Sequence, residues 1–375
     1  MPSYSGVWTL QAQMQAVAAG TWTGQPGFFA WGDNDQGKLG LGDTNNRSSP
    51  VQVAGSIWSQ SASGGSQSLA IKTNGTMWSW GYNGSGQLGS GNVVKRSSPV
   101  QVGALTTWYQ VACGDAFTLA TKADGTLWSW GANGNGQLGL DDVVSRSSPV
   151  QIGALTTWSK VVGGGYHSLA VKTDGTLWSW GFNGSGGLGL DDVAGRSSPV
   201  QVGALTTWYQ IAAGRYFNLV TKTDGTLWSW GRNNFGQLGH NDTVNRSSPV
   251  QVGALTTWYQ VSAGSGHSLA VKTDGTLWSW GNNYYGNLGL NNTVYRSSPV
   301  QVGALTTWSQ IAGGRSHSLA IKTDGTMWSW GRGSSGRLGL GDTDNRSSPV
   351  QVGLLTTWLT LPKIPLSTLS FAITG

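Results

Sequence analysis

The sequence predicts an all-β protein: a seven-bladed propeller whose blades are four-stranded sheets. Tryptophan recurs every 50 residues from Trp58 to Trp358, and the string RSSPVQVGALTTW occurs verbatim four times, which defines seven repeats. A fixed period of about 20–50 residues is typical of solenoids, propellers and arrays. Only 10% of the residues are charged and none is Glu, which excludes long exposed helices.

The repeat that begins at Trp308 illustrates the four expected strands. A first strand starts at this tryptophan, and a second ends at Asp324-Gly325, a dipeptide that is a strong hairpin signal between apolar runs. In the third strand, Trp328 and Trp330 alternate with other residues, so both indoles point to one face of the sheet. The fourth carries Pro349, which suits an edge strand because proline cannot donate a ladder hydrogen bond.

The paired tryptophans of the third strand, such as Trp128 and Trp130, are expected to fill the space between neighbouring blades. Burying one large apolar side chain contributes about 1.5–3 kcal/mol. The alternative, a rim of tryptophans that stack on carbohydrate, is disfavoured because these residues lie inside a strand.

The two ends of the chain predict closure of a ring rather than an open solenoid. The first repeat lacks its second strand and begins at PGFFAWG, with Phe29 where other repeats have Trp. Residues 370–373 match residues 318–321 of the last complete repeat. The C-terminal segment is therefore expected to complete the first blade, and residues 25–375 form the propeller.

Residues 1–24 lie outside the repeats. Val7, Leu10, Met14 and Val17 have helical spacing and Gly20 follows, so a short amphipathic helix is expected. Two interpretations remain open: an arm that packs on the propeller, and a docking segment over residues 1–20 for a larger assembly. No basic region precedes the apolar positions and no apolar stretch reaches 18 residues, so neither a secretory signal nor a membrane span is expected.

The recurring pattern GxxHSLA, then DGTLWSWG, then GQLG resembles the regulator of chromosome condensation repeat family over residues 26–375. The resemblance implies a seven-bladed propeller in which both chain ends share one blade. Family members include a guanine-nucleotide exchange factor on chromatin, β-lactamase inhibitor proteins and modules fused to other domains. This chain keeps its 50-residue register from the second repeat onward, so it lacks an insertion that could act as an exchange wedge. The segment GVWTLQAQMQAVAAGTW also resembles the N-terminal tag of some phage-encoded proteins with these repeats.

The loops after the first and third strands of each repeat emerge on one face, because neighbouring strands alternate in direction. We call this the variable face, since these loops differ in every repeat, whereas the Asp-Gly turns and Gly-Ala-Leu-Thr-Thr links form a nearly constant invariant face. Unconstrained loops can drift, but tyrosine and arginine among Ser, Gly and Asn are typical of a recognition surface. The predicted recognition residues are Tyr82, Tyr166, Phe182, Arg215, Tyr216, Arg232, Phe235, Tyr284, Tyr285, Tyr295, Arg315 and Arg332.

The formal charge of +6 is expected to come from the scaffold rather than from the recognition loops. Seven arginines before Ser-Ser-Pro and six lysines recur with the repeat, against five turn aspartates, a balance of +8. The variable loops hold seven cations and eleven aspartates, a balance of −4. Nucleic acid is therefore an unlikely partner, since proteins that bind it concentrate Lys and Arg on the contacting face.

No catalytic, cofactor or metal site is predicted, and we do not expect an enzyme. Three GxGxxG matches are the turn of the repeat itself and lack a following helix. The repeat position that holds His167, His267 and His317 elsewhere holds Phe, so packing is the better interpretation. Aspartates such as those of residues 33–35 and 342–344 are expected to be solvated, and Cys113 to be a small buried apolar side chain.

These observations predict a non-enzymatic binding or structural module. The specific hypothesis is an appendage or decoration protein of a phage particle, in the virion or at an extracellular surface, whose variable face contacts a protein or a host surface. One alternative is a soluble inhibitor or regulator that caps a partner protein. A nucleotide-exchange or chromatin factor is disfavoured by the charge distribution and the missing insertion.

Overall fold

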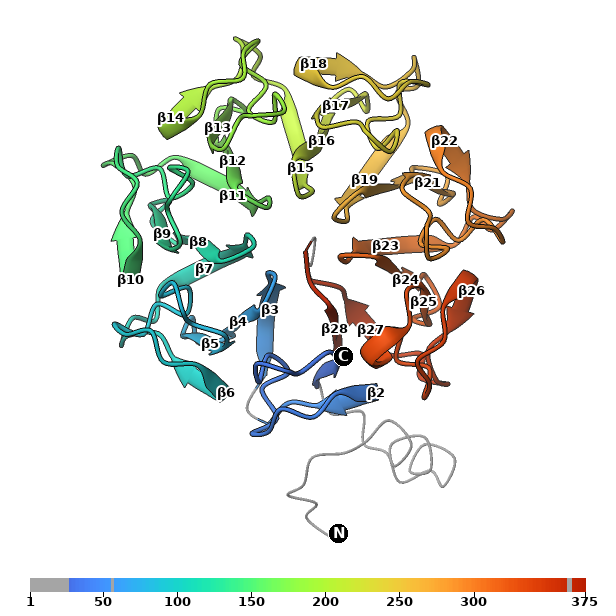
Figure 1. Ribbon diagram of the computed structural model, residues 1–375, viewed down its shortest axis with the longest axis horizontal. Helices are drawn as coiled ribbons and strands as arrows, with labels where there is room; N and C mark the ends of the chain where they lie inside the picture. Colours follow the sequence, from blue (N-terminus) through green and yellow to red (C-terminus); the bar gives the residue numbers. More distant parts are fainter. Residues whose placement is uncertain (1–26, 55–56, 363–365) are drawn as a thin grey trace, which may run out of the picture.

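The computed structural model describes residues 27–54, 57–362 and 366–375. Within them, seven four-stranded antiparallel sheets surround a central opening, as the view along the propeller axis shows (Figure 1). This confirms the predicted fold class. The described helical structure is one 3-10 turn, η1 (Ser334–Gly336), so this part of the chain offers no helix that could span a membrane. The helix expected near residues 7–20 lies outside the described residues.

The blades are numbered along the chain, and each runs from an inner strand at the central opening to an outer edge strand (Figure 1). Blade 2 contains β3 (Trp58–Ser63), β4 (Gln67–Lys72), β5 (Met77–Gly81) and β6 (Arg96–Gln101). Blade 3 contains β7 (Trp108–Cys113), β8 (Phe117–Lys122), β9 (Leu127–Gly131) and β10 (Arg146–Gln151). Blade 4 contains β11 (Trp158–Gly163), β12 (His167–Lys172), β13 (Leu177–Gly181) and β14 (Arg196–Gln201).

The remaining complete blades repeat this order. Blade 5 contains β15 (Trp208–Ala213), β16 (Phe217–Lys222), β17 (Leu227–Gly231) and β18 (Arg246–Gln251). Blade 6 contains β19 (Trp258–Ala263), β20 (His267–Lys272), β21 (Leu277–Gly281) and β22 (Arg296–Gln301). Blade 7 contains β23 (Trp308–Gly313), β24 (His317–Lys322), β25 (Met327–Gly331) and β26 (Arg346–Gln351). The proline of every RSSPVQ strand thus lies on an outer edge, as predicted.

Blade 1 is assembled from both ends of the chain. Its strands are β1 (Phe28–Gly32), β2 (Arg47–Gln52), β27 (Trp358–Thr360) and β28 (Leu369–Thr374). Their order in the sheet is β2, β1, β28, β27, so β1 of the N-terminal repeat pairs with β28 of the C-terminal segment. Phe29 lies opposite Ala372 in this pairing, and the rings of Phe28 and Phe371 pack 4.8 Å apart. The predicted closure is confirmed.

The hydrophobic core is divided among the contacts between neighbouring blades. Trp130 of blade 3 is fully buried and packs with Leu69 and Met77 of blade 2. Trp128 joins the same cluster with one side exposed, and the Lys122 ammonium lies 3.6 Å from the centre of its ring. The paired tryptophans therefore fill the space between blades, as the repeat pattern predicted.

A hydrogen-bonded latch joins each blade to the next and explains the GQLG motif. The indole N–H of Trp180 donates to the backbone carbonyl of Gln137 in the preceding blade, at 2.9 Å. Gly139 follows with a φ of +72°, and a Cβ there would lie 2.8 Å from the Trp180 indole nitrogen. Only glycine suits this position, because it tolerates both the left-handed backbone and the close approach of the ring.

Candidate recognition site

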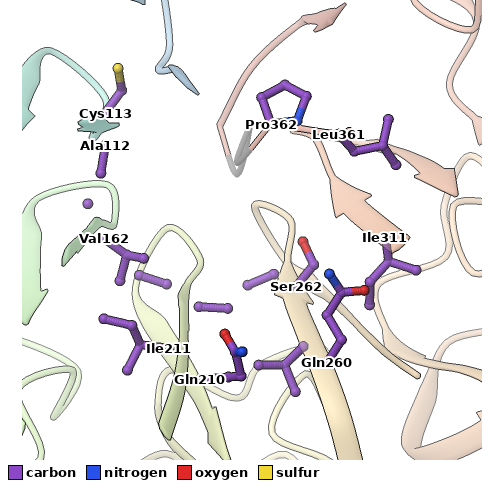
Figure 2. A pocket seen from close by; sticks show the side chains of 15 residues that line it. Ala112, Cys113, Val162, Gln210, Ile211, Gln260, Ser262, Ile311, Leu361 and Pro362 are labelled. Carbon is purple, nitrogen blue, oxygen red and sulfur yellow. The ribbon is translucent and has the colours of Figure 1, made fainter. Parts of the chain in front are cut away.

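The central opening contains a pocket of about 110 Å³, but its lining carries little recognition chemistry. Figure 2 shows that small and aliphatic side chains such as Val162 and Ile211 point into it from the inner strands. No charged residue lines this pocket. Cys113 is buried here and burial raises the pKa of its thiol, which confirms the prediction of a small buried side chain.

The variable loops are held by a buried asparagine at their start. In blade 5 the Asn233 side-chain oxygen accepts from the backbone N–H of Leu238 at 2.8 Å, and its amide donates to Asp242 Oδ1 at 3.0 Å. Blade 7 has Gly333 at this position, because a Cβ there would lie 1.8 Å from the carbonyl oxygen of Asp344. In blades 1–6 the backbone of the loop after the third strand is thus fixed from within, and its outward side chains are free to differ between blades.

The prediction of solvated loop aspartates holds for Asp35 and Asp344, whose side chains are 60% and 78% exposed, but it was wrong for aspartates held in close ion pairs. In five blades an aspartate pairs with the arginine four residues later, as Asp242 Oδ2 does with Arg246 Nη2 at 2.5 Å. The carboxylate of Asp33 lies 2.8 Å from the ammonium of Lys38. Burial opposes ionisation of Asp33, but the Lys38 hydrogen bond and charge outweigh it and lower the pKa of the carboxyl group.

The assignment of charge to the two faces also needs correction. The seven repeated arginines begin the outer strands, so they lie at the variable face and not away from it. Counted there, they give that face fourteen cations against eleven aspartates, a formal balance of +3 instead of −4. The sequence-based prediction correctly grouped these arginines as repeated residues, but it placed them away from the variable face.

One hollow on the variable face gathers most of the predicted recognition residues. We call it the arginine–aromatic basin; it has a volume of about 420 Å³ and lies across blades 5, 6 and 7. Eight of the twelve predicted residues line it, so loops from three neighbouring blades converge there. Its full lining is Arg215, Tyr216, Arg232, Phe235, Gln237, Ser265, Gly266, His267, Asn282, Tyr284, Tyr285, Asn287, Tyr295, Arg315 and Ser316.

Three of the other four predicted residues contact the lining of the basin from its edge. Tyr166 stacks on Tyr216 with ring centres 5.7 Å apart, and Phe182 meets the same ring edge-on at 5.8 Å. The Arg332 guanidinium lies 4.8 Å from the ring centre of Tyr285. Tyr82 stands apart on blade 2, where it is 42% exposed.

Arg337 is a neighbour of the basin that the sequence did not single out. Its side chain is only 3% exposed, and its Nη1 atom has no hydrogen-bond partner within the described chain. Burial, together with the positive charges of Arg332 and Arg315, lowers the pKa of Arg337 to about 10. A repeat alignment could have indicated it, because most other blades have a neutral residue at this position.

The repeated histidines are packing residues, as predicted, and one of them reaches the basin. His267 is 1% exposed and lies within hydrogen-bonding distance, 3.0 Å, of Ser318 Oγ in the next blade. Burial lowers the pKa of His267 to about 4. In the described ranges, no group of three or more His, Cys, Asp or Glu side chains is placed to hold a metal ion.

A family model described as the RCC1-like domain matches residues 16–365 of this chain. The chain belongs to the RCC1-like domain family. The family resemblance read from the repeats is therefore confirmed. A search among curated proteins finds no match to the sequence.

Three solved structures superpose on most of the chain. Human WBSCR16 superposes with a TM-score of 0.83 at 22% identity, over 94% of this chain and 99% of its own. Yeast RCC1 (Prp20), solved bound to Kap60, gives 0.82 at 21% identity over 93% and 88% of the two chains. A second Prp20p structure from Saccharomyces cerevisiae gives 0.79 at 22% identity over 94% and 92%. At these identities the likeness extends to the fold alone.

Proposed function

We propose that this RCC1-like propeller is a non-enzymatic recognition module that binds its ligand, a partner protein or a component of a cell surface, with the variable face. The observation that carries the proposal is the convergence of variable side chains from three blades into one hollow of about 420 Å³. Tyrosine and arginine, which supply seven of its fifteen lining residues, are with tryptophan the residues most enriched among interface hot spots.

The comparisons support a binding role for such propellers. Yeast RCC1 was solved in complex with Kap60, and the second study of Prp20p concerns its binding to Gsp1p and histones. Unlike an exchange factor with a specialised insertion, this chain keeps an unbroken repeat register. A scaffold with individually varied loops suits recognition better than catalysis.

The decisive experiment compares the two faces of the propeller. Replacing Arg232, Arg332, Tyr284 and Tyr285 with Ala should weaken ligand binding by about 2 kcal/mol or more. The melting temperature should stay within a few degrees of that of the parent protein, because these side chains lie outside the inter-blade core. The control set is on the invariant face, where Tyr109 and Tyr259 are 65% and 56% exposed and begin inner strands. It consists of Tyr109, Tyr259, Thr206 and Thr207, each changed to Ala.

Binding is measured as adsorption to host cells of particles that carry the protein, or as capture of the natural ligand by immobilised protein. If the control set weakens binding as much as the variable-face set, or the variable-face set has no effect, the variable loops have drifted and the proposal fails.

We further propose that the module is a phage appendage or decoration protein that docks through residues 1–20. The support is the resemblance of the N-terminal segment to the tags of phage-encoded relatives. Removing residues 1–20 should leave the propeller folded, since β1 begins at Phe28, but should abolish incorporation into the particle. A soluble inhibitor that caps a partner would keep its full binding activity after this deletion, so the experiment separates the two functions.

A further inference from the structure

The arginine–aromatic basin concentrates positive charge and has no carboxylate in its lining, although the charge of Asp115 acts on Arg215 from outside it. Arg215, Arg232 and Arg315 line it, and no lining residue is acidic. Within the described chain none of these three forms an ion pair, whereas Arg246 and four of its repeat equivalents do. The missing counter-charge points to an anionic ligand.

The guanidinium groups are held in place by aromatic rings. The Arg215 guanidinium carbon lies 5.5 Å and that of Arg232 5.6 Å from the ring centre of Tyr216. Arg215 also donates through Nη2 to the Tyr166 hydroxyl at 3.3 Å. Arg side chains packed against rings keep N–H groups available for paired hydrogen bonds to a carboxylate, at a reduced entropic cost.

A comparison of blades 1 and 7 shows that this arrangement is specific to the basin side. Lys38 and Arg337 occupy the same repeat position and are each 3% exposed. Lys38 is neutralised by Asp33 at 2.8 Å, but in blade 7 the residue equivalent to Asp33 is Arg332. Blade 7 therefore places Arg315, Arg332 and Arg337 near one another, and their mutual repulsion is relieved when an anion binds.

The remaining lining indicates a ligand with many hydroxyl groups. The basin has no aliphatic side chain; apart from the arginines and aromatic rings it presents mainly amides and hydroxyls. Asn287 is 1% exposed and its side-chain oxygen has no partner within the described chain, so a donor from a ligand would satisfy it. A volume of about 420 Å³ is in the usual range for small-ligand pockets. Sugars suit such a site, because their hydroxyls both donate and accept and their C–H faces pack on rings.

We propose that the basin binds a sugar residue that carries a carboxylate, such as a uronic or sialic acid unit of a surface glycan; the inference rests on the proposed recognition role of the variable face. The carboxylate pairs with arginines of the lining, the amides bind ring hydroxyls, and Tyr284 and Tyr285 pack against the sugar. An extended nucleic acid is disfavoured, because within the described chain every arginine without an ion pair, apart from Arg96 in blade 2, lies in blades 5–7, and eleven aspartates share the variable face.

The test is calorimetric titration of the full chain with the methyl glycosides of glucuronic acid and N-acetylneuraminic acid, and with methyl glucoside as the uncharged counterpart. We expect at least one acidic sugar to bind, and the uncharged sugar to bind about ten-fold more weakly or not at all. Arg232→Ala and Arg315→Ala should each weaken binding by about ten-fold or more. Arg146→Ala is the matched control, because Arg146 lies on the same face but pairs with Asp142 outside the basin.

The inference is wrong if neither acidic sugar binds, if methyl glucoside binds equally well, or if Arg146→Ala weakens binding as much as the basin variants. It is also wrong if inorganic phosphate or a tetra-aspartate peptide binds more tightly than both acidic sugars. Melting temperatures of all variants are measured, and Arg315→Lys, which keeps the charge without the paired geometry, replaces any variant that fails to fold. If the sugars fail while the variable-face substitutions still weaken binding of the natural ligand, the sugar inference falls and the proposed function stands.

Discussion

The indole N–H of Trp31 donates to the backbone carbonyl of Arg337 at 3.0 Å and so joins residues 306 positions apart. The hydroxyl of Ser370 donates to the same carbonyl at 2.8 Å. Trp180 and Ser168 make the same pair of bonds to Gln137 between blades 3 and 4. The ring is therefore closed by the contact that joins every other pair of blades, and blade 1 needs its C-terminal strand to take part in it.

Deleting residues 370–375 should destabilise the whole propeller. The deletion removes most of β28, the ring of Phe371 and one of the two bonds to the Arg337 carbonyl, and it exposes the pairing edge of β1. We expect a fall in melting temperature of about 10 °C or more, or aggregation, measured by differential scanning calorimetry. Melting within a degree or two of the intact chain would refute closure by the C-terminal strand.

Adding a carboxylate to blade 6 should stabilise the protein slightly. Asn292 occupies the repeat position of Asp242 and accepts the same backbone N–H bond, but Arg296 lacks the ion pair that Arg246 makes. Asn292→Asp should therefore add about 0.2–1 kcal/mol, and Asp242→Asn should remove a similar amount. Both effects should shrink in high salt. Shifts of the same sign for the two variants, or no shift in either, would show that these pairs do not contribute.

The fold was predictable because a single repeat contains nearly all the sequence signals that define one blade. Four strands, an Asp-Gly turn, a Pro-bearing edge and two inward tryptophans recur at a fixed spacing, so each inference was repeated five to seven times within the chain. The ends were interpretable for the same reason, since residues 370–373 copy an interior strand.

The basin was only partly predictable. The sequence showed which positions vary, but whether Arg232 and Arg315 share a hollow depends on how far each loop leans toward the next blade. The sequence-based prediction assigned the repeated arginines to the wrong face. The repeat period shows which residues are equivalent, but it does not show on which face of the propeller their side chains pair with an aspartate. Arg337 was missed because its significance comes from burial beside other arginines.

The glycine after each latch should be sensitive to substitution. Gly139→Ala forces an L-residue to a φ of +72° and places its Cβ 2.8 Å from the Trp180 indole nitrogen. We expect a loss of about 2–4 kcal/mol in the free energy of unfolding, measured by denaturant titration. Gly153→Ala is the control: its φ is +57°, but its Cβ would meet nothing within 4 Å, so only about 1 kcal/mol should be lost. Equal losses would mean that contact with the indole is unimportant.

Acidification should destabilise the propeller before its carboxylates titrate, and the buried histidines are the reason. Burial lowers the pKa values of His167 and His267 to about 4 from an ordinary 6.5, and it lowers that of His317 as well. Between these values the unfolded chain binds more protons than the folded protein, so the free energy of unfolding falls as pH decreases from 6.5 toward 4. Each pKa unit corresponds to about 1.4 kcal/mol, so one histidine accounts for about 3 kcal/mol near pH 4.

His267→Phe should remove the contribution of one histidine to this pH dependence of stability without damaging the fold. Phe217 already occupies the same repeat position in blade 5 and is fully buried. Ser318, which loses its contact with His267, still donates to the carbonyl of Asn287 at 2.8 Å. At pH 7.5 the variant should lie within about 1.5 kcal/mol of the parent protein, and between pH 6.5 and 4.5 its stability should decline less steeply. The measurement is urea unfolding at a series of pH values; parallel curves for the two proteins over that range would show that His267 does not drive the acid sensitivity.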